Sequence, residues 1–135
     1  MLVLLVEDNP GDIFLTEELF EDLNLNVSLK ILTNGEEAIE YLSNYRNWTP
    51  EEVPSLIILD INLPRKNGHQ VKEFINTKKE LSKIPVFMVT TSSALMDKNK
   101  CQNNKVNAFF TKPIDPISFK SALIDHQISV NSLSI

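Results

Sequence analysis

Acidic, hydroxyl and basic side chains stand at the ends of four short apolar runs in this 135-residue chain. The runs cover residues 2–6, 55–59, 86–90 and 107–111. If they are parallel strands of one sheet, their carboxyl ends meet at the edge where open α/β folds bind ligands. We therefore expect the polar groups of these four strand ends to converge. They are Glu7, Asp8, Asp60, Thr90, Thr91 and Lys112.

Glu7, Asp8 and Asp60 would form a cluster of three carboxylates at this edge. Two carboxylates about 5 Å apart repel by roughly 3 kcal/mol at an effective dielectric constant of about 20. Such clusters persist when a cation is bound or when one member is protonated. Oxygen donors without a His or Cys cluster favour Mg²⁺, which keeps several waters and recruits phosphate oxygens. The cluster therefore predicts a magnesium site for phosphoryl chemistry.

Asp60, Thr90 and Lys112 have the side chains that phosphoryl transfer to a carboxylate needs. A carboxylate can attack phosphorus to form an aspartyl phosphate. A lysine ammonium and a threonine hydroxyl can then neutralise or hydrogen-bond the phosphoryl oxygens. Taken singly, acids after strands often cap helices, and a Thr or Lys at a strand end is common. The prediction therefore depends on the joint position of these residues.

Strands that alternate with helices must position this set. Helical spacing of apolar residues separates the strands, and residues 27–32 form one further apolar run. This alternation predicts an α/β fold with right-handed crossovers, a (βα)5 doubly wound parallel sheet. Known folds of this kind supply the flavodoxin-like strand order 2-1-3-4-5, with ligands at the ends of strands one and three. The helical spacing is carried by Leu15, Leu19 and Leu23, by Ile39 and Leu42, by Val71, Phe74 and Ile75, and by Ile117, Ile124 and Ile128.

Local signals refine this pattern. In residues 27–32 apolar and polar residues alternate, which is typical of a strand nearer an edge. Asn34 with Glu37 resembles a capping box, and Asn67-Gly68 predicts a turn before a helix. Residues 93–104 are weakly patterned, so we expect a less firmly packed fourth helix. Residues 1–128 are expected to form one domain, and residues 129–135 a short tail.

Composition excludes several classes of protein. The 13 basic and 18 acidic residues give a net charge of −5, and no basic cluster is longer than a pair, which argues against nucleic acid as a partner. The longest apolar runs fall far short of the ~20 residues of a membrane span. No secretory signal is visible, and the single cysteine, Cys101, fits a reducing compartment. We therefore expect a cytoplasmic protein.

Other kinds of site have little support. The chain has three glycines, so neither a dinucleotide fingerprint nor a P-loop can be written. His69 and His126 lie far apart, and neither stands at metal-binding spacing from Cys101. We expect both histidines at the surface.

These residues resemble the receiver domains of two-component response regulators. The match runs from the first strand to the last helix. It consists of four fragments at the expected strand ends, in the expected order: Val6-Glu7-Asp8, residues 59–64 followed by Gly68, residues 84–90, and Phe110-Thr111-Lys112-Pro113.

The resemblance implies that Asp60 is the phosphoacceptor and that a histidine kinase donates the phosphoryl group. It further implies that Asp8 and Asp60 bind Mg²⁺ directly. Glu7 would bind through water, and Asn62 through its backbone carbonyl. Lys112 would contact the phosphoryl group.

The resemblance also implies a switch. Thr90 matches the switch hydroxyl because it lies five residues after Pro85, and Thr91 is the alternative. The peptide before Pro113 is commonly cis in the family. Phe109 occupies the aromatic switch position, where several members have Tyr. Without a hydroxyl this ring can gain packing but no hydrogen bond, so we expect coupling by sterics alone.

No output domain follows the last helix, which implies a single-domain regulator that acts through protein contacts rather than as an enzyme. Residues 7–12 and the loop before Pro54 are similar to the small regulators paired with bacterial phytochrome-type kinases. A homodimer is left open, and the sequence does not identify the downstream target.

Three other interpretations remain. A phosphatase of the haloacid-dehalogenase type also uses a nucleophilic Asp, but its second Asp stands two residues on, where this chain has Asn62. A flavodoxin-like FMN binder needs free N–H groups after strand one, where Glu7-Asp8 would repel phosphate. A docking module that is never phosphorylated would not need the intact set of acids, Thr and Lys.

Overall fold

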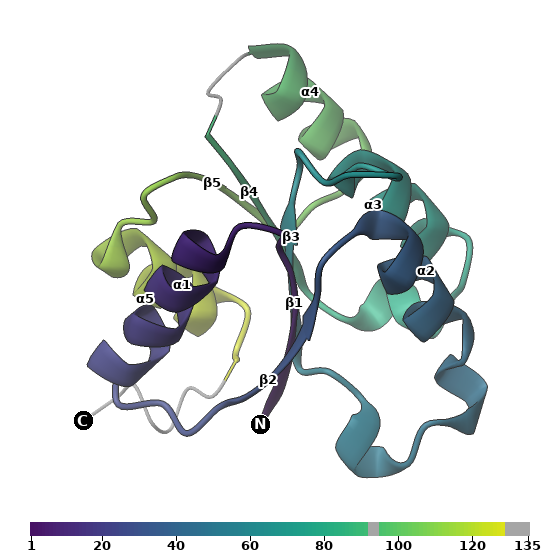
Figure 1. The fold of residues 1–135 in the computed structure, drawn as a ribbon, viewed down its shortest axis with the longest axis horizontal. Coiled ribbons are helices and arrows are strands. Elements are labelled where there is room, and N and C mark those ends of the chain that lie inside the picture. The colour runs from purple at the N-terminus through teal and green to yellow at the C-terminus, as the bar shows by residue number, and fades with distance from the viewer. Residues whose placement is uncertain (92–94, 129–135) are drawn as a thin grey trace.

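A computed structural model describes residues 1–91 and 95–128 of the chain. Five parallel strands form one sheet in the order β2-β1-β3-β4-β5 (Figure 1). The α/β fold and strand order expected from the sequence are confirmed. The strands are β1 (Leu2–Val6), β2 (Ser28–Leu32), β3 (Leu56–Asp60), β4 (Val86–Thr90) and β5 (Ala108–Thr111).

In the part of the chain that the structure describes, five α-helices cover the two faces of the sheet (Figure 1). One face carries α1 (Pro10–Asp22) and α5 (Pro116–Asp125), and the other carries α2 (Gly35–Ser43), α3 (Gly68–Asn76) and α4 (Leu95–Asn103). Three short 3₁₀ turns, η1 (Tyr45–Asn47), η2 (Pro50–Glu52) and η3 (Leu81–Lys83), lie in the connections.

A continuously apolar strand contributes side chains to the core on both faces of the sheet, because successive side chains point to opposite faces. In β1, Leu4 and Val6 pack on the side of α2, α3 and α4, whereas Val3 and Leu5 pack on the side of α1 and α5. All four side chains are buried. The sheet is therefore a rigid core from which the strand ends project.

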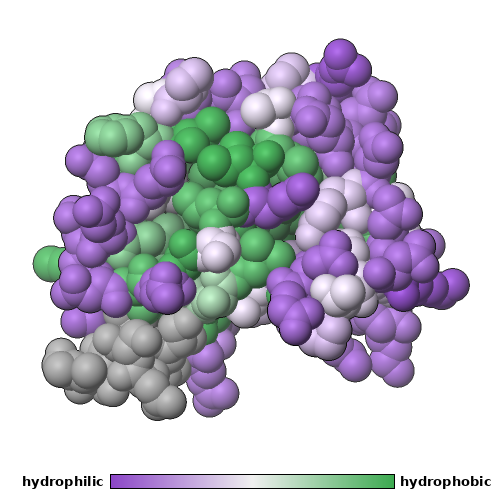
Figure 2. Space-filling view, turned by 60° about the horizontal axis from the view of Figure 1, so that its bottom comes forward, coloured by the Kyte–Doolittle hydropathy of each residue, from purple (hydrophilic) through white to green (hydrophobic). Residues whose placement is uncertain are grey.

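Strand β2 lies at an edge of the sheet, as its alternating pattern predicts. Its Ile31 side chain is 37% exposed, in contrast to the buried strands β3 and β4. Figure 2 shows one face of the molecule on which hydrophobic residues gather at the centre, with hydrophilic residues on either side.

Asparagine side chains cap the N-termini of α2 and α3. The Asn34 side chain accepts a hydrogen bond from the backbone N–H of Glu37 at the start of α2, as the capping pattern predicts. Asn67 and Gln70 form a reciprocal capping box at the start of α3. The Asn67-Gly68 pair thus begins the helix itself, because the asparagine satisfies a backbone donor of its first turn.

Some boundaries and burials differ from expectation. Asp60 is the last residue of β3 rather than the first residue after it. Helix α4 begins at Leu95, and of its side chains that the structure describes only Cys101 is buried, which agrees with a loosely packed helix. The proposed tail, residues 129–135, lies outside the described residues. In residues 1–91 and 95–128, none of the helices combines the length and apolar character needed to cross a bilayer.

The expectation that both histidines lie at the surface is wrong for His69, whose exposed fraction is 4%. His69 lies in the first turn of α3, and its Nε2 is 3.4 Å from Asp97 Oδ1 of α4. Lys72, one turn further along α3, is also buried and pairs with Asn76. Position along the chain does not reveal that α4 covers this part of α3.

Candidate functional site

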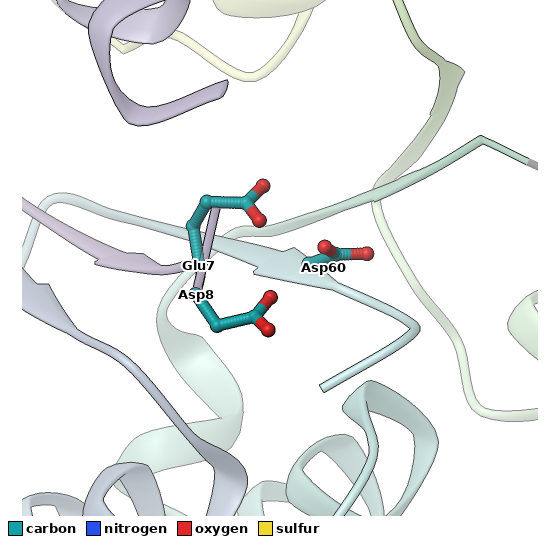
Figure 3. Close-up of side chains that lie close together, drawn as sticks. All are labelled: Glu7, Asp8 and Asp60. Atoms are coloured by element: carbon teal, nitrogen blue, oxygen red, sulfur yellow. The ribbon is translucent and has the colours of Figure 1, made fainter. Parts of the chain in front are cut away.

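The three predicted acids lie together at the carboxyl end of the sheet (Figure 3). One carboxylate oxygen each from Glu7, Asp8 and Asp60 lies within 4.8 Å of the others. The register of the sheet explains this, because Val6 of β1 pairs with Leu59 of β3, and Glu7 and Asp60 come next. Glu7 and Asp60 are 3% and 5% exposed, whereas Asp8 is exposed. The cluster thus has two buried members and one that faces solvent.

Lys112 supplies the positive charge of the site. Its ammonium nitrogen lies 2.7 Å from Glu7 Oε1, 2.8 Å from Asp12 Oδ2 and 3.1 Å from Asp60 Oδ2. Lys112 directly follows β5, and its backbone N–H donates to the Thr90 carbonyl at 2.7 Å, so it lies beside the end of β4. The Lys112–Pro113 peptide bond is cis, as the resemblance implies.

Asp12 is the member of this group that the sequence did not single out. It lies in the first turn of α1, where an acid is ordinarily explained by the helix dipole. The signal that could have identified it is its position, because the first turn of the helix that follows β1 lies at the same edge of the sheet as the end of β1.

At both Glu7 and Lys112, burial and the ion pair between them shift the pKa in opposite directions. Burial raises the pKa of Glu7 to about 7, while the hydrogen bond from Lys112 opposes this rise and the neighbouring Asp60 adds to it. At Lys112 burial lowers the pKa, but hydrogen bonds to three carboxylates together outweigh burial and raise the pKa above its ordinary value. Lys112 is therefore held in its cationic form, whereas burial favours the protonated form of Glu7.

Asn62 connects the acids to the end of β4. Its backbone N–H donates to Asp60 Oδ1 at 3.0 Å, and its side-chain amide lies 3.4 Å from Thr90 Oγ1. Thr90 is fully buried, whereas Thr91 is exposed. Of the two threonines proposed from the sequence, Thr90 is thus the one that the structure brings to Asn62.

The backbone of α3 approaches Asp60 closely. The Gly68 N–H donates to the Ile61 carbonyl at 2.9 Å, and a Cβ atom at Gly68 would lie 2.5 Å from the Asp60 carbonyl oxygen. Only glycine fits this approach without a backbone shift. Phe109, by contrast, lies on β5 in register with Met88 and is partly buried on the α2, α3 and α4 side of the sheet.

A cavity of about 180 Å³ adjoins the acids between α1 and the segment that joins β5 to α5. Polar groups of the site, among them Asp12, Asp60 and Lys112, lie along it together with apolar side chains such as Leu15 and Pro113. Leu15 and its neighbour Phe14 are 52% and 59% exposed. The cavity therefore has both Asp60 and the exposed, apolar Leu15 in its wall.

The sequence matches the model of the response regulator receiver domain over residues 3–124. Response regulator Rcp1 of Synechocystis sp. is 34% identical over 111 residues, which cover 82% of this chain and 76% of Rcp1. The crystal structure of the Mn²⁺-bound form of Rcp1 has a TM-score of 0.77 at 31% identity and covers 95% of this chain and 94% of its own.

Two further solved structures are similar over nearly the whole chain. The phosphorylated cyanobacterial phytochrome response regulator RcpA has a TM-score of 0.76 at 32% identity, with 98% of this chain and 94% of RcpA covered. The bacteriophytochrome response regulator AtBRR has a TM-score of 0.79 at 34% identity, with 94% and 92% covered.

Proposed function

The chain belongs to the family of response regulator receiver domains, and from this premise we propose that Asp60 is its phosphoacceptor. The observation that carries the proposal is the contact of Lys112 Nζ with Asp60 Oδ2 beside two further acids. Asp60 is the carboxylate at the centre of the group, because Lys112 and the Asn62 N–H each contact one of its oxygens. The chain is thus a signalling domain, and the phosphatase interpretation is not favoured.

The proposed metal is Mg²⁺. The donor set fits a hard divalent cation, because three carboxylates supply oxygens within 4.8 Å of one another and no softer ligand belongs to the group. Asp8 and Asp60 would hold the ion directly, Glu7 through water, and Asn62 through its backbone carbonyl. When bound, such an ion neutralises the charge that develops on the phosphoryl oxygens. The existence of an Mn²⁺-bound form of the relative Rcp1 supports the binding of a divalent cation by this chain.

Phosphoryl transfer would use the side chains at the carboxyl ends of β3, β4 and β5. A carboxylate oxygen of Asp60 attacks phosphorus as the bond from phosphorus to the donor nitrogen of a phosphohistidine breaks, and the electron pair of that bond stays with the imidazole. Lys112 is close enough to donate to a phosphoryl oxygen on Asp60, because its ammonium already contacts this carboxylate. Asn62 restrains the other Asp60 oxygen through its backbone N–H.

Phosphorylation would then shift the population of two arrangements of the face formed by α4, β5 and α5. Thr90 would move to the phosphoryl group, and Phe109 would rearrange in the space that this movement leaves. Phe109 has no hydroxyl, so packing alone would couple the two. The loosely packed α4 is the element best able to adjust.

The proposed donor is a sensor histidine kinase of the phytochrome type, because the relatives include phytochrome and bacteriophytochrome response regulators. A cytoplasmic location is part of the proposal, since the buried Cys101 is a free thiol, as expected in a reducing compartment. Leu15, which lines the cavity, and the exposed Phe14 that precedes it offer apolar contact area to the partner that brings the phosphohistidine.

Incubation with acetyl phosphate and Mg²⁺ followed by intact mass spectrometry tests the assignment. The wild-type chain should gain the mass of one phosphoryl group, and the Asp60→Asn variant should gain none. The added mass should be lost in alkaline hydroxylamine, which cleaves acyl phosphates. An equal gain in Asp60→Asn, or a rapid turnover of phosphomonoesters by the wild type, would contradict the proposal.

A further inference from the structure

Asp12 is held beside the site by the local structure of α1. Its backbone N–H donates to the side chain of Asn9 at 3.1 Å, and its carbonyl accepts from the Thr16 hydroxyl at 3.0 Å. The Asp12 side chain is 28% exposed and extends towards Lys112 rather than capping the helix, because Asn9 already fills that role. The backbone of Asp12 is therefore held in place by two hydrogen bonds. Among the described contacts, its carboxylate has one cationic partner, Lys112.

The three hydrogens of the Lys112 ammonium are matched by three carboxylate acceptors. The contacts with Glu7 and Asp12 measure 2.7 and 2.8 Å, and the contact with Asp60 measures 3.1 Å. The ammonium thus lies nearer to the α1 side of the site than to the proposed phosphoacceptor. A phosphoryl oxygen can gain one of these N–H groups only in place of a present acceptor.

We propose that Asp12 is a positioning residue: it holds the Lys112 ammonium on the α1 side of the site and competes with an incoming phosphodonor for it. The inference rests on the proposed function of Asp60 and adds a determinant of its rate. Asp12 takes no part in the bonds that form and break at Asp60. It changes only which oxygens accept hydrogen bonds from Lys112.

Charge makes this competition strong. Asp12 and Asp60 each place an oxygen about 3 Å from the same nitrogen, so their carboxylates are at most about 6 Å apart. One ammonium serves three carboxylates, and a dianionic donor must attract it away from at least one of them. Replacing Asp12 by Asn removes one negative charge beside the ammonium but keeps an acceptor oxygen, so Lys112 is held less strongly and an incoming donor attracts it more easily.

The test measures phosphorylation by acetyl phosphate at saturating Mg²⁺ across a range of donor concentrations. For Asp12→Asn, the half-saturating concentration of acetyl phosphate should fall about fivefold, while the maximal rate stays within about twofold. Asp12→Glu keeps the charge and should behave like the wild type. Asp22→Asn is the matched control, because Asp22 is an acid on the same helix, lines the same cavity and makes no described ion pair with Lys112.

A double variant distinguishes an effect of Asp12 that acts through Lys112 from direct repulsion between the Asp12 carboxylate and the anionic donor. In a Lys112→Met background the Asp12→Asn substitution should no longer change the half-saturating concentration, because the partner is absent. An equal fall in that background, or with Asp22→Asn, overturns the inference, as does an unchanged value for Asp12→Asn. A wild type that takes up no phosphoryl group overturns the proposed function as well. Circular dichroism confirms that each variant is folded.

Discussion

The Lys112 ammonium lies 3.1 Å from Asp60 Oδ2, although 52 positions separate the two residues in the chain. Strand β4 lies between the strands that carry them, and the Lys112 N–H donates to the carbonyl of Thr90 at its end. Three neighbouring strand ends thus bring one cation to a cluster of acids. We expect the balance between that cation and the acids to affect both the stability of the domain and its phosphorylation.

Lys112→Met should destabilise the domain because it leaves Glu7, Asp12 and Asp60 without a cation. Removing one partner of a buried ion pair typically costs about 3 kcal/mol or more. We expect a loss of this size in the free energy of unfolding, measured by urea denaturation at pH 7 in the presence of EDTA. Saturating Mg²⁺ should restore part of the loss, since a ligand that binds only the folded state stabilises it.

Lys112→Arg is the control for this substitution, because it keeps the charge but changes the shape of the donor group. Its loss should be clearly smaller than that of Lys112→Met. Equal losses for the two variants would mean that the geometry of the ammonium, rather than its charge, supports the site.

Asp60→Asn should stabilise the domain when no divalent cation is present. It removes one of three carboxylates that lie within 4.8 Å of one another, at the expense of the longest of the Lys112 contacts. We expect a gain of about 1 kcal/mol in EDTA and a smaller stabilisation by Mg²⁺ than in the wild type. Thermal unfolding with and without Mg²⁺ measures both. Asp22→Asn, at the C-terminal end of α1, should leave the stabilisation by Mg²⁺ unchanged, and a loss of stability in Asp60→Asn would refute the explanation.

Glu7 should make the metal-free domain less stable as the pH rises. Burial raises the pKa of Glu7 from 4.5 to about 7 in the folded state. Between these values the folded state binds a proton that the unfolded state has lost, so the free energy of unfolding falls with increasing pH. The fall should total about 3 kcal/mol from below pH 4.5 to above pH 7.

Glu7→Gln isolates this effect, because other titrating groups cancel in the difference between the two proteins. The stability of the wild type minus that of the variant, measured in EDTA from pH 4.5 to 8, should fall along this range. Mg²⁺ should reduce the fall, since a cation favours the ionised carboxylate. A flat difference would show that Lys112 keeps Glu7 ionised throughout.

Gly68→Ala should destabilise the domain and disturb Asp60, because the added Cβ would lie 2.5 Å from the Asp60 carbonyl oxygen. That neighbour is backbone at the end of β3 and cannot move aside cheaply. We expect a loss of about 2 kcal/mol together with slower phosphorylation. Gly11→Ala is the matched control in the first turn of α1, where the nearest atom, 3.2 Å away, belongs to the side chain of Asn9. It should cost clearly less than Gly68→Ala, since a side-chain oxygen rather than the backbone of β3 has to shift and alanine favours a helix.

Much of the fold and of the site could be predicted because the relevant signals are local. Apolar runs identify buried parallel strands, and the residue at the end of each strand projects to one edge whichever helices pack around it. Strand-end position predicts five residues of the site, and the structure brings them to one edge of the sheet. They are Glu7, Asp8, Asp60, Thr90 and Lys112. Boundaries such as the end of β3 were less certain, since one residue more or less in a strand leaves the apolar pattern unchanged.

The sequence by itself determined which residues stand at the strand ends and hence the class of chemistry, since periodicity and strand order suffice for that. Only the tertiary structure decided that Asp12 joins the site, because its contact with Lys112 spans 100 positions and depends on how α1 packs beside the segment after β5. It also decided that His69 is buried under α4 and that burial raises the pKa of Glu7. Burial and long-range contacts depend on the packing of whole elements, which no local pattern of residues specifies.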